Sequence, residues 1–102
     1  MDDRCYVITR ADLPVPQQAV QAAHATQTFA GRHPGDYAQT TLVVLTVPDE
    51  PALKALRARF ELTPTRLAVF HEPDRGGELT AFCAAGAAAR KLCARLPMAF
   101  TP

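Results

Sequence analysis

The chain has 102 residues, of which 48% are hydrophobic, and its 11 Lys and Arg against 10 Asp and Glu give a formal net charge of +1. This length and composition predict a single packed domain and exclude a largely disordered chain. The apolar runs are too short to cross a membrane, and the acidic start over residues 1–4 is unlike a signal peptide, so we expect a soluble cytoplasmic protein.

The first half of the chain alternates strand and helix patterns. Residues 5–9 form a short apolar run that is typical of a buried strand, and a brief turn follows. Pro16 suits the first turn of a helix, where a missing N–H costs nothing, and the helical pattern continues to Ala30. A loop over 32–39 then leads to a β-branched run over 41–47, which predicts a strand buried on both faces.

The second half continues this alternation. Asp49 is placed to cap a second helix. Strands over 66–70 and 78–84 follow, joined by a tight loop over 71–77, and a last helix spans 87–96. The predicted order is therefore β-α-β-α-β-β-α. Because strands joined by helices pair in parallel and strands joined by short loops pair antiparallel, we expect an α/β fold with a four-stranded mixed sheet covered by helices.

The three cysteines do not indicate a disulfide or a metal site. Cys5, Cys83 and Cys93 each lie in an apolar run, and no two of them have metal-ligand spacing. We expect them to be buried, reduced thiols. The sequence also lacks a nucleophile elbow, a phosphate-binding loop and a dinucleotide fingerprint, so no cofactor and no metal are predicted.

The helix over 16–30 carries two stripes of side chains. One consists of small or apolar residues suited to close packing on a sheet: Ala19, Ala22, Ala23, Thr26, Phe29 and Ala30. The other contains Gln17, Gln21, His24 and Thr28, spaced four, three and four residues apart. Imidazole is the commonest general acid or base near neutral pH, but spacing alone leaves open whether His24 is catalytic or a partly buried histidine bonded to a carbonyl.

A second candidate site follows the strand over 66–70. The run His71-Glu72-Pro73-Asp74 places two carboxylates and an imidazole after a strand end, where ligand sites of α/β sheets often lie. Such groups could carry out acid–base chemistry or bind a cation. Pro-Asp followed by Gly-Gly is also ordinary turn chemistry, so both interpretations stay open.

Several segments resemble type 2 peptidyl-tRNA hydrolases. In that family a strand ending in Arg-x-Asp-Leu leads into a helix carrying Gln-x-x-His, and this chain has YVITRADL over 6–13 and QAAHA over 21–25. The run LVVLTVPDE over 42–50, with the Leu-rich helix after it, and the strand over 78–84 are similar to later elements of the family. The resemblance covers nearly the whole chain and implies one domain over 1–102 with a three-layer α/β/α fold.

The chain departs from the family at two places that matter for activity. Gln17 stands where the family has a lysine important for activity, in a stretch about two residues shorter. The family's Asp-Ala-Gly-x-Thr loop is replaced by the run over 72–77, so Glu72 falls roughly at the position of the family's aspartate. The chain is therefore similar to a divergent branch that includes short bacterial and phage members.

The resemblance implies hydrolysis of the ester between a peptidyl or N-blocked aminoacyl group and tRNA. It suggests His24 or Glu72 as the base, and Asp12 or Asp74 as the group that orients it. The amide N–H groups at the start of the first helix could hold a phosphate or the developing oxyanion. The expected substrate-binding residues are Gln17, Gln21, Arg10, Thr28 and Thr80.

A different class of function stays open beside the enzyme. The near-neutral charge and the missing lysine also suit a non-catalytic descendant of the fold that binds RNA, a small molecule or a protein. tRNA is the expected partner of the enzyme, and the resemblance implies a homodimer. Whether Glu72 and Asp74 bind a cation is left undecided.

Overall fold

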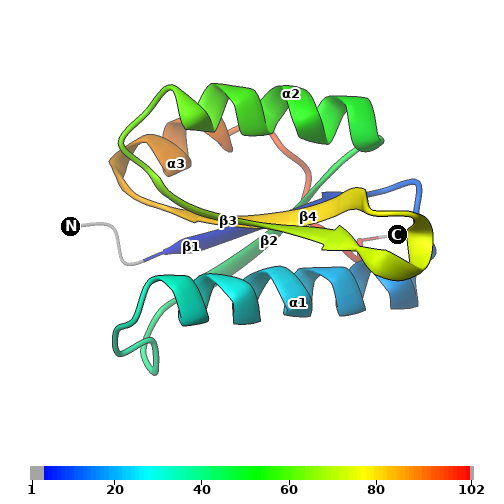
Figure 1. Cartoon of the computed structure of the whole chain (residues 1–102). Helices are drawn as coiled ribbons and strands as arrows, with labels where there is room; N and C mark the ends of the chain where they lie inside the picture. The colour runs from blue at the N-terminus through cyan, green and yellow to red at the C-terminus, as the bar shows by residue number, and fades with distance from the viewer. Residues whose placement is uncertain (1–3, 102) are drawn as a thin grey trace.

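The computed structural model describes residues 4–101 and consists of three layers, with a four-stranded sheet between α1 on one face and α2 and α3 on the other (Figure 1). The elements are β1 (Cys5–Arg10), α1 (Val15–Arg32), β2 (Leu42–Val47), α2 (Glu50–Glu61), β3 (Arg66–Glu72), the 3-10 turn η1 (Pro73–Arg75), β4 (Glu78–Ala85) and α3 (Ala87–Leu92). The predicted fold class and element order are confirmed. Among the described residues, no helix is both long enough and apolar enough to cross a membrane.

The strands lie in the order β2-β1-β4-β3. β1 and β2 are parallel, as expected for strands joined by a helix, and β4 runs antiparallel to both of its neighbours. The carboxyl ends of β1, β2 and β3 therefore lie at one edge of the sheet, together with the start of β4 and the N-terminal turns of α1 (Figure 1).

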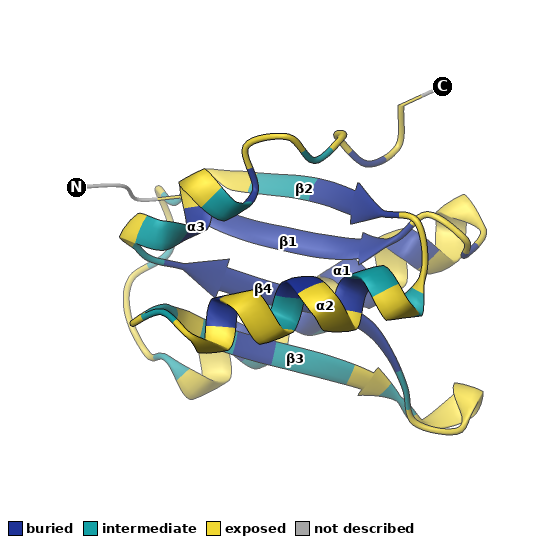
Figure 2. Cartoon of the chain, turned by 90° about the horizontal axis from the view of Figure 1, so that it is seen from above, coloured by how far each residue is buried: buried dark blue, intermediate teal, exposed yellow. Residues whose placement is uncertain are grey.

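β2 is an edge strand of the sheet, not a central one. The prediction of a strand buried on both faces is correct only for Leu45–Val47, because Leu42 is 52% exposed. β1 and β4 are the central strands and are buried along almost their whole length (Figure 2). Residues 97–99 run along the outer side of β2, where the Ala99 N–H donates to the Val44 carbonyl at 2.9 Å.

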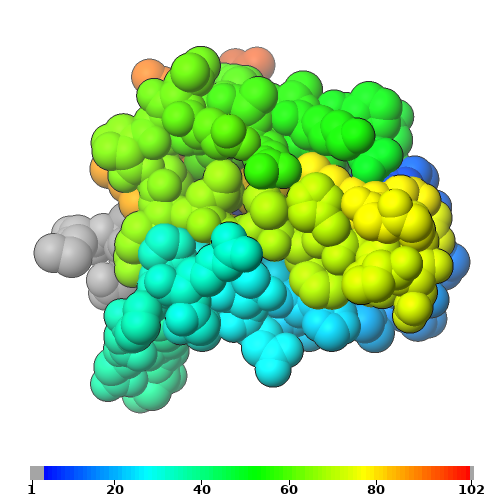
Figure 3. All heavy atoms as spheres, viewed as in Figure 1, coloured from blue at the N-terminus to red at the C-terminus, as the bar shows by residue number. Residues whose placement is uncertain are grey.

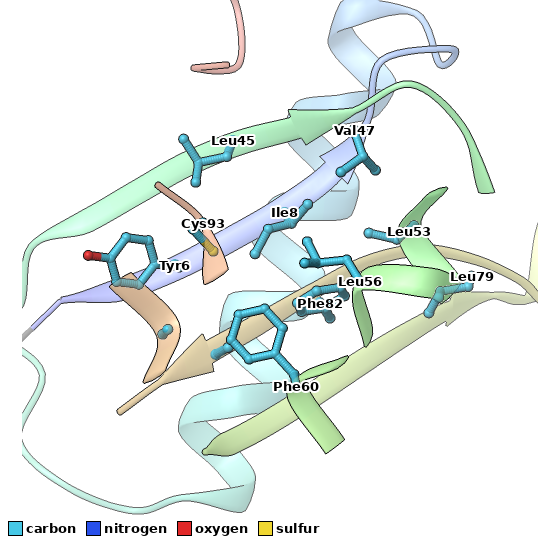
Figure 4. Close-up of a cluster of buried hydrophobic side chains, with 12 residues drawn as sticks. Tyr6, Ile8, Leu45, Val47, Leu53, Leu56, Phe60, Leu79, Phe82 and Cys93 are labelled. Atoms are coloured by element: carbon cyan, nitrogen blue, oxygen red, sulfur yellow. The ribbon is translucent and has the colours of Figure 1, made fainter. Parts of the chain in front are cut away.

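The larger part of the core lies between the sheet and helices α2 and α3 (Figure 4). Phe60 of α2 packs edge-to-face on Phe82 of β4, with ring centroids 5.5 Å apart. Leu53 and Leu56 are also buried and form the inward face of this helix. This packing holds α2 over the central strands.

Helix α1 covers the opposite face of the sheet through Ala25 and Phe29. The predicted packing stripe is partly wrong, because Ala19 and Ala23 are exposed whereas Gln21 is 2% exposed. A polar side chain can take a buried position where it finds hydrogen-bond partners. Gln21 finds them at the edge of the sheet, as described below.

The ends of the elements follow local signals in part. The Asp49 carboxylate accepts the Ala52 N–H at 3.0 Å, which confirms the predicted cap of α2. α3 ends at Leu92 and not at Leu96, because the chain continues in tighter turns, in which the Leu96 N–H donates to the Cys93 carbonyl at 3.1 Å. β3 continues two residues past its predicted end to Glu72, since it remains paired with β4.

The three cysteines are buried and free, as predicted. Burial raises the pKa of the Cys93 thiol to about 12, and it also raises the pKa of Cys5 and of Cys83. The thiols are therefore neutral at physiological pH and act as small apolar side chains.

Phe82 tests the packing of this core. We expect Phe82→Ala to lower the free energy of unfolding by about 3–5 kcal/mol, because a fully buried ring is replaced by a cavity. Leu62, which is 88% exposed, supplies the control, and Leu62→Ala should stay within about 0.5 kcal/mol of wild type. Both values come from chemical denaturation, and similar losses in the two variants would contradict this packing.

Candidate functional site

The sheet edge where β1 and β3 end carries most of the predicted site residues (Figure 1). One set, here called the Gln21 group, comes from three separate elements: Gln21, His24, Glu72 and Thr80. A second set, the Arg10 cluster, contains two predicted residues and one that was not predicted: Arg10, Asp12 and Glu78. Three predicted residues stand outside both sets: Gln17, Thr28 and Asp74.

The buried amide of Gln21 joins α1 to two strands. Its nitrogen donates to the Glu72 carboxylate of β3 at 2.9 Å, and its oxygen accepts the Thr80 hydroxyl of β4 at 2.6 Å. Thr80 is linked in turn to β1, because the Thr9 hydroxyl donates to the Thr80 carbonyl at 3.0 Å. The predicted residues Gln21, Glu72 and Thr80 thus form one hydrogen-bonded chain.

A β-bulge places Thr80 in this chain. Phe70 pairs with Ala81 and His71 pairs with Leu79, so Thr80 is an extra residue on β4. Ala81 packs on the α1 side of the sheet, so strict alternation would point Thr80 to the α2 side. The bulge turns the Thr80 hydroxyl to the α1 side, where it meets Gln21.

His24 lies one helical turn beyond Gln21 on α1. Its imidazole stacks flat on the ring of Phe70 in β3, with centroids 4.4 Å apart and an angle of 4° between the planes. The imidazole is only partly buried, and its electrostatic effect on the pKa of Glu72 is smaller than that of the hydrogen bonds to this carboxylate. Stacking on Phe70 fixes the plane of the imidazole ring.

Glu72 is held as an ionised carboxylate. The pKa of Glu72 is lowered first by the hydrogen bond from Gln21 and then by the backbone N–H of Asp74. Asp74 itself, which was predicted to orient the base, contributes this N–H, and its carboxylate is exposed. The site therefore presents a fixed negative charge next to an imidazole at neutral pH.

The Arg10 cluster lies at the carboxyl end of β1. Arg10 is 5% exposed and donates two hydrogen bonds of 2.9 Å to Asp12 and one of 2.7 Å to Glu78. Hydrogen bonding to Asp12 raises the pKa of Arg10, and hydrogen bonding to Arg10 lowers the pKa of Asp12 and of Glu78. The predicted roles of Arg10 with phosphates and of Asp12 with the base would both require this ion-paired cluster to open.

Gln17 and Thr28 lie at the ends of the predicted polar stripe. Gln17 is exposed in the first turn of α1. The Thr28 hydroxyl donates to the His24 carbonyl within the helix at 2.8 Å, so it is not directed at a ligand. The predicted contacts of Gln17 and Thr28 with a substrate therefore stay predictions. The central pair of the stripe, Gln21 and His24, contributes to the Gln21 group.

Three residues of this region were missed by the sequence analysis. Gln18 is buried and donates to the Leu13 carbonyl at 2.7 Å, which fixes the turn before α1. Glu78 pairs with Arg10, 68 residues away, and no local pattern signals such a pairing. Arg75 of η1 lies near the carboxylates of both groups and influences the pKa of Glu72 and of Glu78.

The Gln21 group has the parts of an acid–base site. It combines an oriented imidazole, an ionised carboxylate and a buried amide that keeps the carboxylate in place. Within residues 4–101, no three His, Cys, Asp or Glu side chains are grouped so that they could hold a metal ion. The chemistry that these side chains can supply is proton transfer to and from a bound molecule.

Comparisons with known proteins establish the fold alone. No family model and no curated protein matches the chain. A solved structure of a protein of unknown function from Agrobacterium tumefaciens strain C58 is similar, with a TM-score of 0.74 over 96% of this chain and 98% of that chain, at 16% sequence identity. That structure supports the three-layer architecture and assigns no activity.

Thr80→Val tests the link between the bulge and α1. The substitution keeps the shape of the side chain but leaves the buried Gln21 oxygen without its donor, so we expect a loss of about 1–3 kcal/mol in the free energy of unfolding. Thr28→Val, which removes a hydroxyl bonded within its own helix, should cost less than about 0.5 kcal/mol. Equal losses in the two variants, measured by denaturant titration, would contradict the link.

The Arg10 cluster predicts an acid-dependent loss of stability. In the folded chain, the pKa of Glu78 lies below its ordinary value of 4.5. The stabilisation of the folded state by the ionised Glu78 is therefore complete above pH 4.5, and it is lost as the pH falls through the lowered pKa. Unfolding free energies at about pH 6 and about pH 3 should therefore differ less in Glu78→Gln than in wild type. Glu61→Gln, on the outer side of α2, is the control and should follow the wild-type curve.

Proposed function

We propose that this chain hydrolyses the ester that joins a peptidyl or N-blocked aminoacyl group to the 3′ ribose of tRNA. The observation that carries the proposal is the oriented pair of His24 and Glu72. The imidazole is held flat on Phe70 beside a carboxylate that the buried Gln21 keeps in position. His24 lies in a segment that resembles type 2 peptidyl-tRNA hydrolases, and Glu72, at the end of β3, falls roughly at the position of that family's aspartate.

The reaction follows from these two side chains. His24 accepts a proton from a water molecule, whose oxygen attacks the ester carbonyl carbon. The tetrahedral intermediate collapses, the bond between the acyl carbon and the ribose oxygen breaks, and protonated His24 returns the proton to that oxygen. The Glu72 carboxylate stabilises the imidazolium that exists between the two proton transfers.

The start of α1 suits a phosphate of the tRNA end better than the oxyanion. Gln17, in the first turn, precedes His24 by seven residues, which corresponds to about 10 Å along the helix. The first turn contains no acidic side chain and no side-chain cap, so the positive end of the dipole and the N–H groups of Val15 and Gln17 can receive an anion. Pro16 has no N–H, and the Gln18 N–H donates to the Pro14 carbonyl at 2.9 Å. Arg75, on the facing turn η1, adds a cation to this side of the molecule.

The replacement of the family's lysine by Gln17 predicts a slow enzyme. A charge-assisted contact contributes roughly 1.5–3 kcal/mol, and its loss lowers a rate by about ten- to a hundredfold. Arg75 could supply part of the missing charge, although its guanidinium lies 3.7 Å from the Glu78 carboxylate and is partly neutralised by it. Weak turnover is therefore expected.

One observation favours a non-catalytic binding domain as the second candidate. Arg10 and Asp12, two residues that the resemblance assigns to substrate and catalysis, are bonded to each other. If Arg10 and Asp12 only stabilise the fold, fewer side chains are left to bind a substrate or transfer a proton. This alternative predicts binding of an acylated tRNA end, or of another ligand, without turnover.

Release of an N-acetylated aminoacyl group from tRNA by the purified chain tests the proposal. We expect turnover above the uncatalysed rate, and His24→Ala and Glu72→Gln should each lower it at least tenfold, because one removes the base and the other the charge that stabilises its protonated form. The controls are Leu62→Ala and Glu61→Gln, whose side chains are exposed at the end of α2, on the other face of the sheet. No turnover by the folded protein, or equal effects of the control substitutions, would contradict the hydrolase.

A further inference from the structure

Two adjoining hollows lie at the end of the molecule opposite the Gln21 group. An apolar cavity of about 210 Å³ lies between the last turns of α1 and the start of β1, and a more open hollow of about 370 Å³ adjoins it. Cys5, Tyr37 and Thr40 line both hollows, so the two spaces lie side by side. Ala30, which lines the inner cavity, is nine residues beyond Gln21, or about 13 Å along α1.

The inner cavity, at about 210 Å³, has room for an apolar group the size of a benzene ring. Phe29, Leu42 and Cys83 form part of its wall, and Tyr37 covers it from the segment that follows α1. The Tyr37 ring meets Phe29 edge-to-face at 5.9 Å, and its hydroxyl donates to the carbonyl of His33, which holds this cover against the helix end. Folded domains contain few voids larger than a water molecule, and cavities of about 150 Å³ with apolar walls bind benzene.

The segment that covers the cavity stands out from the body of the molecule. Figure 3 shows residues 34–41 projecting beyond the C-terminal end of α1. Gly35, Asp36 and Gln39 of this segment line the outer hollow, so the opening of the inner cavity is bordered by polar groups. A ligand that enters from this side would pass from a polar rim into an apolar interior.

Arg66 places a positive charge at the rim of the opening. The Arg66 guanidinium lies 5.6 Å from the centroid of the Phe29 ring, and Arg4 also lines the outer hollow. The carboxylate here, Asp36, accepts the N–H of Ala38 at 3.0 Å in its own turn. Among residues 4–101, no carboxylate lies within ion-pair distance of Arg66.

We propose that the two hollows form one binding site for a small monocarboxylate with a benzene-sized apolar group. The apolar group fills the inner cavity against Phe29 and Tyr37, and the carboxylate is held at the rim by Arg66. Charge-assisted hydrogen bonds to a guanidinium are the natural partners of such an anion. The proposal does not rest on the hydrolase, because none of the residues of this site belongs to the Gln21 group.

Titration of the full chain with phenylacetate and with its neutral analogue phenylacetamide, followed by amide and side-chain NMR shifts, tests this site. We expect shifts centred on Phe29 and Tyr37, and an affinity for phenylacetate about tenfold or more above that for the amide. Arg66→Gln should remove this difference, while Arg59→Gln, a loss of the same charge on α2 across the sheet, should preserve it.

A second variant tests the cavity itself. Ala30→Leu adds a side chain at the wall of the cavity from an exposed helical position, so the fold is retained and both compounds should lose their binding. Equal affinity for the acid and the amide in wild type, no binding of either at millimolar concentration, or shifts centred on the Gln21 group would each overturn the proposal.

Discussion

The buried amide of Gln21 is the interaction on which the rest of the site depends. An amide in this position must find partners for its polar atoms, because an unpaired buried group is costly. Its partners, Glu72 and Thr80, come from the two strands that flank the β3–β4 turn. The same two hydrogen bonds therefore fix the rotation of α1 on the sheet and hold a carboxylate beside the imidazole of His24.

The two ends of the sheet are built differently. At the end that holds the Gln21 group, polar side chains satisfy one another, and the Arg10 cluster brings a buried guanidinium together with two carboxylates. At the other end, an apolar space is left open between α1, β1 and the segment 33–41. One helix thus contributes to both ends, through Gln21 and His24 near its start and through Phe29 and Ala30 near its end.

The fold was predictable from the sequence because its signals are local. Runs of β-branched residues, Asp49 before a helix and prolines at helix starts each act within a few residues, and together they gave the element order. The order of the strands within the sheet carries no such signal, which is why β2 was expected in a buried position and lies at a side of the sheet.

The site was predictable only in its residue types. The spacing of Gln21 and His24 on one helix face indicated a polar site. The partners of these residues depend on contacts across 51 and 59 positions of the chain, which no periodicity encodes. The bulge that turns Thr80 toward Gln21 also follows from strand pairing and not from a local pattern. The pairing of Arg10 with Glu78 was missed for the same reason.

The proposed hydrolysis requires the Gln21 group to receive the acylated end of tRNA. NMR titration of the chain with an N-acetylaminoacyl adenosine, in which a stable amide replaces the 3′ ester, tests this binding. We expect the largest shifts on Gln21, His24, Glu72 and Thr80, whether or not the ester is hydrolysed quickly. Shifts concentrated elsewhere, or none at millimolar analogue, would contradict it.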